Sequence, residues 1–100
     1  MTLPISVDKE RLADFCRRWN ISEFALFGSV LRDDFGPESD VDVLVSFGPG
    51  GGISFDNRVQ ILEELEEMFG RKVDLVVKKN LRNPFRRRAI LNSREILYAA

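Results

Sequence analysis

Apolar and polar residues follow two different periods along the chain, and the period changes from one segment to the next. Helical spacing is clear in two long segments, and Asn83-Pro84 opens a third helix because proline is favoured in a helix's first turn. Shorter apolar runs, bounded by glycine, proline or charged residues, predict strands. The predicted helices cover residues 7–19, 54–69 and a segment that begins at Pro84. The predicted strands cover residues 24–27, 40–47, 72–77 and the EILYA stretch at 95–99.

The same patterns predict which side chains face the core. In the strand over 40–47, side chains alternate, so one face carries Asp40, Asp42 and Leu44 and the other carries Val41, Val43 and Val45. Apolar stripes are expected on the helices. Their predicted members are Leu12, Phe15, Cys16 and Trp19 in the first helix, Phe55, Val59, Leu62, Leu65, Met68 and Phe69 in the second, and Phe85, Ala89 and Ile90 in the third.

Polar residues and glycines mark the ends of these elements. Either Asp8 or Ser6 is expected to cap the first helix, and Ser54 to cap the second, because their side-chain oxygens can accept from free backbone N–H groups. Gly70 fits the position just past the second helix. A short helix is expected over residues 29–34, directly after the strand that ends before Gly28.

The order of the elements indicates the fold class. A chain of 100 residues is the size of one domain, so residues 1–100 are expected to form a single unit. Helices and strands are mixed along a short chain, which predicts an α/β or α+β fold with one small sheet and flanking helices.

Composition restricts the chemistry. The sequence contains no histidine and a single cysteine, Cys16, which excludes Ser-His-Asp and Cys-His nucleophiles, cysteine zinc clusters and an internal disulfide. The net charge of −1 provides no global attraction to nucleic acid or membranes. No apolar run approaches the ~18 residues of a membrane span, and the N-terminus is not signal-like, so the cytoplasm is the expected location. Carboxylates, hydroxyls, lysines and arginines remain as functional groups.

Three carboxylates stand at the beginnings of predicted strands. Asp40 and Asp42 project from one strand face, about 7 Å apart at ~3.3 Å per residue. Asp74 begins a later strand, and it would face the same site if the two strands are neighbours. Carboxylates without histidine or cysteine are typical ligands of hard cations such as Mg²⁺ or Mn²⁺.

Gly28-Ser29 precedes these carboxylates at a strand-to-helix turn. Such a turn presents free N–H groups and the positive end of a helix dipole, which suits phosphate. Gly28 lets a phosphate approach the backbone, and the Ser29 hydroxyl can donate to it. Phosphate and divalent metal together indicate a nucleoside triphosphate, with two metal ions holding the attacking and leaving oxygens.

The stretch GSVLRDDFGPESDVDVLV, together with KVDLVV further on, resembles the Gly-Ser, Asp-x-Asp signature of the DNA polymerase β-like nucleotidyltransferase superfamily. It is most similar to the minimal nucleotidyltransferase group, and the resemblance covers nearly the whole chain. It implies a polymerase-β-like fold in which Asp40, Asp42 and Asp74 hold metal ions and act as the catalytic carboxylates. Asp74 would also help to deprotonate the acceptor. The remaining matches, with the nucleotide-binding role that the resemblance implies, are Gly28, Ser29, Arg32 and Ser39.

Small members of this group are often antitoxins, and this implies the function. Each is typically encoded beside an HEPN-type RNase toxin, and some members transfer AMP from ATP to a tyrosine of that toxin. The resemblance therefore implies a Mg²⁺-dependent protein adenylyltransferase, with two ions and ATP, in a type VII-like toxin–antitoxin pair. A hetero-oligomer with the HEPN toxin is expected, and direct binding of nucleic acid or membrane is not.

Several alternatives stay open in the sequence. The protein could silence its partner by binding alone, with a vestigial site, or it could use a small-molecule or RNA acceptor. Arg32 either binds phosphate or pairs with an acid such as Asp33 or Glu38, and Ser39 is expected to orient the beginning of its strand rather than to touch nucleotide. The basic stretch over residues 78–88 is either a solvated face or a surface for an acidic partner or nucleotide phosphates.

Overall fold

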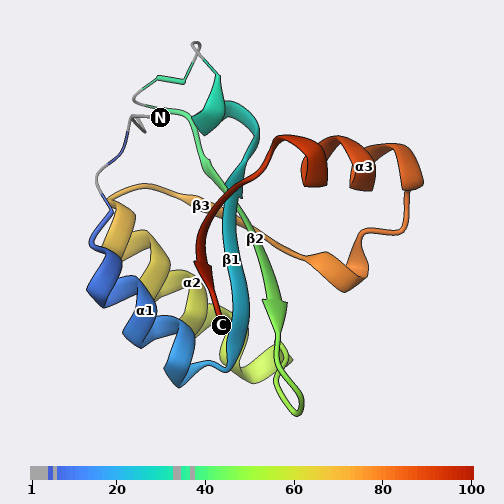
Figure 1. The fold of residues 1–100 in the computed structure, drawn as a ribbon. Helices are drawn as coiled ribbons and strands as arrows, with labels where there is room; N and C mark the ends of the chain where they lie inside the picture. The colour runs from blue at the N-terminus through green and yellow to red at the C-terminus, as the bar shows by residue number, and fades with distance from the viewer. Residues whose placement is uncertain (1–4, 6, 33–34, 37) are drawn as a thin grey trace.

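The computed structural model describes residues 5, 7–32, 35, 36 and 38–100, with the backbone alone at 55 and 56. The predicted helices and strands are all present among these residues, in the predicted order (Figure 1). In chain order they are α1 (Lys9–Arg18), β1 (Ile21–Phe27), the 3₁₀ helix η1 (Gly28–Leu31), β2 (Val41–Phe47), α2 (Phe55–Phe69), β3 (Val73–Val77), the 3₁₀ helix η2 (Lys78–Asn80), α3 (Pro84–Ser93) and β4 (Glu95–Ala99).

Four strands form one mixed sheet in the order β3-β2-β1-β4. β1 pairs antiparallel with both β2 and β4, whereas β2 pairs parallel with β3. The parallel pair needs a crossover, which α2 supplies, because two parallel strands cannot be joined by a tight turn. This topology brings the end of β1 and the beginnings of β2 and β3 to the same edge of the sheet.

Helices cover both faces of the sheet. α1 and α2 lie side by side on one face, and α3 lies on the other (Figure 1). The larger core, between the sheet and the helix pair, is built around fully buried Phe15, Phe24 and Leu65. The smaller core lies under α3, where Ile90 and Leu81 pack near Leu44 of β2. Leu44 and Asp42 lie on the same face of β2, so α3 occupies the face that carries the carboxylates.

Side-chain caps fix the helix ends where the sequence predicted them. The Asp8 carboxylate accepts from the N–H groups of Glu10 and Arg11, at 3.1 and 3.2 Å, while the alternative cap Ser6 lies outside the described residues. Ser54 and Asn57 form a reciprocal capping box at the beginning of α2. Gly70 ends α2 with a left-handed φ of 67°.

Three predicted core positions are wrong. Val59 and Phe85 are 62% and 85% exposed, and Ala89 is also exposed. In α2 the buried side chains are four residues apart, at Ile61, Leu65 and Phe69, and Val59 lies about 200° around the helix from Ile61 at ~100° per residue. In α3 only Ile90 is buried, as predicted, and Phe85 lies about 140° away from it.

Local boundaries also differ from the prediction. β1 begins at Ile21 rather than at residue 24, because Asn20 takes a left-handed φ of 56° that ends the first helix and starts the strand. The short helix after Gly28 ends at Leu31, and Asp33 and Asp34, which the predicted helix over residues 29–34 included, lie outside the described residues. The side chain of Phe55 is not described. No helix in the described part of the chain is long and apolar enough to cross a membrane.

Cys16 is fully buried in the larger core, as the sequence predicted. Burial raises the pKa of its thiol to about 12, against a smaller opposing effect of Arg17. Because the thiolate is the reactive form, we expect Cys16 to resist thiol reagents at neutral pH. Ellman's reagent should label the native protein only as fast as it unfolds, and should label the guanidinium-denatured protein at once. Rapid labelling of the native chain would contradict this burial.

Candidate active site

The carboxylates predicted from the sequence lie at one edge of the sheet. Asp42 and Asp74 are directly paired in the parallel register of β2 and β3, so their side chains lie on the same face of neighbouring strands. Asp40 lies two residues before Asp42. The N–H of Val41 donates to the carbonyl of Lys72 at 2.9 Å and fixes the beginning of β2 against the approach to β3.

Gly28 lies against the Asp42 carboxylate. Phe27, the last residue of β1, pairs with Asp42, so the chain turns into η1 directly beside that side chain. Gly28 has a φ of 73°, and a Cβ added there would lie 2.2 Å from Oδ2 of Asp42. Both the backbone conformation and the contact therefore require glycine at this position.

The electrostatic environment of Asp42 opposes ionisation. Burial raises the pKa of this carboxyl above its ordinary value of 3.8, and the negative charges of Asp74 and Asp40 raise it further. A hydrogen bond from the Ser29 backbone N–H and the positive charge of Arg32 act in the opposite direction. Asp42 is therefore within electrostatic range of Asp74, Asp40 and Arg32, and its carboxylate accepts from the Gly28-Ser29 turn.

Beside this region is a cavity of about 320 Å³, lined by Gly28, Leu31, Arg32, Ser93 and Glu95. The Arg32 side chain is exposed here, and its charge reaches Asp42. The Ser29 hydroxyl donates to the backbone carbonyl of Asp40 at 3.4 Å, which joins the turn after β1 to the beginning of β2. The turn thus presents both its backbone and an arginine to the space next to the carboxylates.

Ser39 faces the preceding loop. Its hydroxyl accepts from the N–H of Gly36 at 3.1 Å, so the side chain closes a turn just before Asp40. This geometry fits the predicted role of orienting the beginning of the strand. The structure therefore places the Ser39 side chain in the loop that precedes Asp40.

Arg71 is a site residue that the sequence did not reveal. Its guanidinium donates to the carbonyl oxygens of Gly36 and Ser39, at 2.6 and 3.2 Å, and lies over the ring of Phe35, 4.4 Å from its centroid. Arg71 precedes β3 by two residues, so it links the loop that carries Asp40 to the strand that carries Asp74. Its sequence neighbourhood, next to Lys72, gives no signal of this role.

Comparisons with known proteins decide the family. The sequence model of the nucleotidyltransferase domain matches residues 9–97, which include all the site residues described above. The chain belongs to the nucleotidyltransferase domain family. The Gly-Ser, Asp-x-Asp resemblance and the prediction of a nucleotidyltransferase enzyme are therefore confirmed.

Relatives of this nucleotidyltransferase include proteins named as protein adenylyltransferases. A predicted protein adenylyltransferase of Methanocaldococcus jannaschii is 37% identical over 73 residues, which cover 73% of this chain and 73% of that protein. The protein adenylyltransferase MntA of Thermococcus cleftensis is 32% identical over 81 residues, which cover 81% of this chain and 77% of that protein.

Solved structures confirm the fold of this nucleotidyltransferase. A predicted minimal nucleotidyltransferase matches with a TM-score of 0.70 and 29% identity, over 87% of this chain and 86% of that chain. A toxin–antitoxin complex with AMP-PNP contains a chain that matches with a TM-score of 0.72 over 94% of this chain and 75% of that chain. At 17% identity, this second likeness shows the fold alone.

The carboxylates of this nucleotidyltransferase fit a hard divalent cation. They supply only oxygen ligands. Burial is the main cause of the raised pKa of Asp42, and repulsion from Asp74 and Asp40 adds to it; a bound cation would offset this repulsion. Within the described residues, no three acidic, cysteine or histidine side chains converge closely enough to hold one ion. The donor set therefore fits an ion that takes its remaining ligands from water and substrate phosphate, as Mg²⁺ commonly does.

Proposed function

We propose that this nucleotidyltransferase is the antitoxin of a type VII-like HEPN/MNT toxin–antitoxin pair, which transfers AMP from ATP to a tyrosine of its partner, an HEPN RNase toxin. The observation that carries the proposal is the pairing of Asp42 with Asp74 beside the Gly28-Ser29 turn. The names of the relatives support AMP transfer to a protein, and the solved MntA–HepT complexes are of the same fold. The pair would act in the cytoplasm.

The reaction assigns a role to each side chain. The tyrosine oxygen attacks the α-phosphorus of ATP, a new O–P bond forms, and the bond to pyrophosphate breaks. We assign Asp74 the tyrosine proton, and we assign Gly28, Ser29 and Arg32 the triphosphate, which the Ser29 hydroxyl and the Arg32 guanidinium suit as donors. We propose that Asp40, Asp42 and Asp74 would hold two Mg²⁺ ions, which would supply positive charge next to the phosphate oxygens.

Intact-mass analysis of the partner tests this proposal. The product of the neighbouring gene would be incubated with this protein, ATP and Mg²⁺, with the Asp40→Asn/Asp42→Asn variant as control. A mass gain of one or more AMP units, absent in the control, is the expected result. A stable complex without any mass gain would support the alternative of silencing by binding. Transfer to a small molecule or an RNA end in the absence of a partner would replace the proposed acceptor.

The contacts of Arg71 predict an effect on metal use. We expect Arg71→Met to slow transfer about tenfold, because the loop before Asp40 loses two hydrogen bonds and the contact with Phe35. The Mg²⁺ concentration for half-maximal rate should rise as well, which a purely structural role would not produce. Lys72→Met removes the neighbouring exposed charge and is the matched control. Equal Mg²⁺ dependence in the two variants would contradict a positioning role for Arg71.

A further inference from the structure

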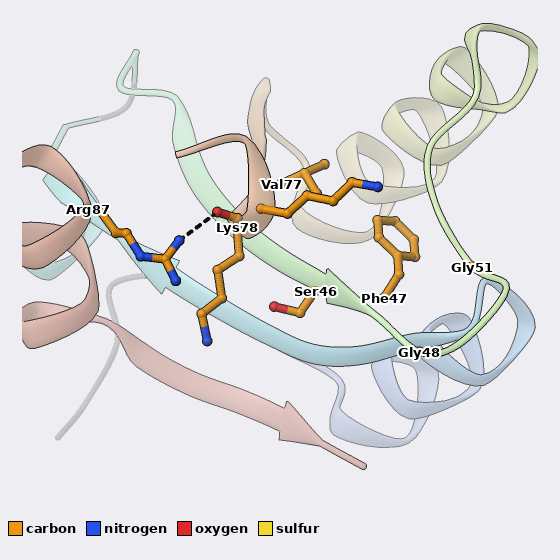
Figure 2. A pocket seen from close by; sticks show the side chains of 8 residues that line it. Ser46, Phe47, Gly48, Gly51, Val77, Lys78 and Arg87 are labelled. Atoms are coloured by element: carbon orange, nitrogen blue, oxygen red, sulfur yellow. Dashed lines mark hydrogen bonds between the residues drawn. The ribbon is translucent and has the colours of Figure 1, made fainter. Parts of the chain in front are cut away.

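A second cavity lies at the opposite end of β2 and β3 from the carboxylates. It has a volume of about 390 Å³, and we call it the distal pocket. Its walls come from the end of β2, the glycine loop that follows, the beginning of η2 and one side of α3 (Figure 2). The distal pocket is lined by Val77, at the end of β3, and by Ser46, Phe47, Gly48, Gly51, Lys78, Lys79 and Arg87.

The distal pocket is positively charged. Lys78, Lys79 and Arg87 line it, and none of its described lining residues is acidic. An adjoining cavity of about 260 Å³ shares Lys79 and adds Arg58. The sequence did not decide whether the basic stretch over residues 78–88 is a solvated face or a surface for an acidic partner or phosphates. In the structure this stretch contributes three cationic side chains to one concave site.

One of these cationic groups, the Arg87 guanidinium, is held in place. Arg87 Nη1 donates to the Lys78 carbonyl at 3.1 Å, which fixes the guanidinium at the pocket wall and leaves its other N–H groups available (Figure 2). A fixed guanidinium is a strong ligand for oxyanions because its donors are arranged as a fork. Lys78 extends from the same backbone segment that accepts this hydrogen bond.

The Ser46 hydroxyl supplies an unused donor. Its Oγ is buried and has no hydrogen-bond partner among the described residues, which is uncommon for a buried hydroxyl. In Figure 2 the hydroxyl points to the side where Lys78 and Arg87 lie. The carboxylate of Glu23, on the neighbouring strand, is 3.2 Å from Arg94 in an ion pair, so its charge is already balanced.

The distal pocket is separate from the carboxylate end. Ser46 and Asp42 lie on the same face of β2, about 13 Å apart at ~3.3 Å per residue. Between them, Leu44 is fully buried in the small core beneath α3 with Leu81 and Ile90. A ligand in the distal pocket therefore does not contact the residues assigned to the transfer reaction.

We propose that the distal pocket binds a phosphate-class oxyanion, such as pyrophosphate, independently of divalent metal. Phosphate oxygens can accept together from a guanidinium fork, a hydroxyl and ammonium groups, which is the donor set present here. The cavity is large enough for a diphosphate or for the phosphate end of a nucleotide. This site goes beyond the proposed function, because it involves none of the carboxylates.

Calorimetric titration of the full chain with inorganic pyrophosphate tests the site. EDTA is included, so that metal-dependent binding at the carboxylates is removed. Arg87→Met and Lys79→Met should each raise the dissociation constant about tenfold, as expected for the loss of one charge-assisted contact. Lys79 is exposed, so its replacement keeps the test valid if Arg87→Met fails to fold. Arg88→Met, with an exposed side chain on the same helix, removes the same charge outside the pocket and should bind as the wild type does.

Further ligands identify the source of the phosphate. Tighter binding of pyrophosphate than of ATP would assign the site to the free anion, and the reverse would assign it to a nucleotide. Both results support the proposal. No measurable binding of either, equal weakening by Arg88→Met, or preference for a polyglutamate peptide would overturn it. None of these results depends on AMP transfer, so failure of this site and failure of the proposed function are distinguishable.

Discussion

Replacing Asp42 with asparagine is expected to abolish AMP transfer while leaving the fold at least as stable as that of the wild type. The activity should fall by at least ~10²–10³-fold, because the reaction would lose the negative charge that we propose binds the metal. Asparagine keeps the size of the side chain and an oxygen that can accept from the Ser29 N–H. The loss should therefore come from chemistry rather than from unfolding.

The stability part of this prediction follows from the raised pKa of Asp42. Burial, followed by the charges of Asp74 and Asp40, makes the folded-state pKa higher than the unfolded value near 3.8. Between the unfolded value near 3.8 and the folded-state pKa, the folded state binds more protons than the unfolded state, so the free energy of unfolding decreases as the pH rises through this range. At neutral pH without metal, ionised Asp42 thus lowers stability, and asparagine removes this effect.

Thermal melts and the transfer assay measure both effects on the same variant. In EDTA at pH 7, Asp42→Asn should melt at or above the wild-type temperature, and Mg²⁺ should raise the midpoint of the wild type more than that of the variant. Glu63→Gln removes an exposed carboxylate from α2 and should change neither activity nor the response to Mg²⁺. An Asp42→Asn protein that retains transfer would exclude the metal role of this residue.

Replacing Gly28 with alanine is expected to damage the site more than the fold. The added Cβ would lie 2.2 Å from Asp42 Oδ2, so the carboxylate must move away. Misplacing a catalytic group by about 1 Å can reduce the rate on the order of 10²-fold. The φ of 73° adds a strain of about 1–2 kcal/mol. We expect a lower melting temperature together with an almost complete loss of transfer.

Gly70→Ala separates these two effects. Gly70 has a similar φ of 67°, but a Cβ there meets nothing within 4 Å. Its replacement should lower the melting temperature through backbone strain and leave the transfer rate of the folded protein unchanged. If Gly28→Ala lost only as much activity as Gly70→Ala, the contact between Gly28 and Asp42 would have no part in catalysis.

The arrangement of the candidate site could be predicted only in part from the sequence. Asp40 and Asp42 could be placed on one strand face because side-chain alternation is local. The pairing of Asp42 with Asp74 depended on which strands are neighbours, and the fifteen-residue crossover helix between them leaves no register signal in the sequence. The family resemblance, rather than periodicity, implied that the three carboxylates belong to one site.

Contacts between residues that are far apart in the sequence could not be predicted from it. Arg71 reaches the carbonyls of Gly36 and Ser39, 35 and 32 residues away, and the surrounding residues do not encode this contact. The exposure of Phe85 was missed for a related reason, since Ile90 is the one residue of α3 that is buried, at 7% exposure. Spacing along a helix predicts which residues share a side but not how much of that side is covered.

The parallel pairing of β2 and β3 also bears on how the enzyme fails when heated. The spacing of Asp42 and Asp74 is set by the ladder of backbone hydrogen bonds, which holds neighbouring strands ~4.8 Å apart. Fraying of a helix end or loosening of a surface loop leaves that spacing unchanged. Loss of the Asp42–Asp74 spacing should therefore coincide with cooperative melting of the sheet, which sets the upper temperature limit of the reaction.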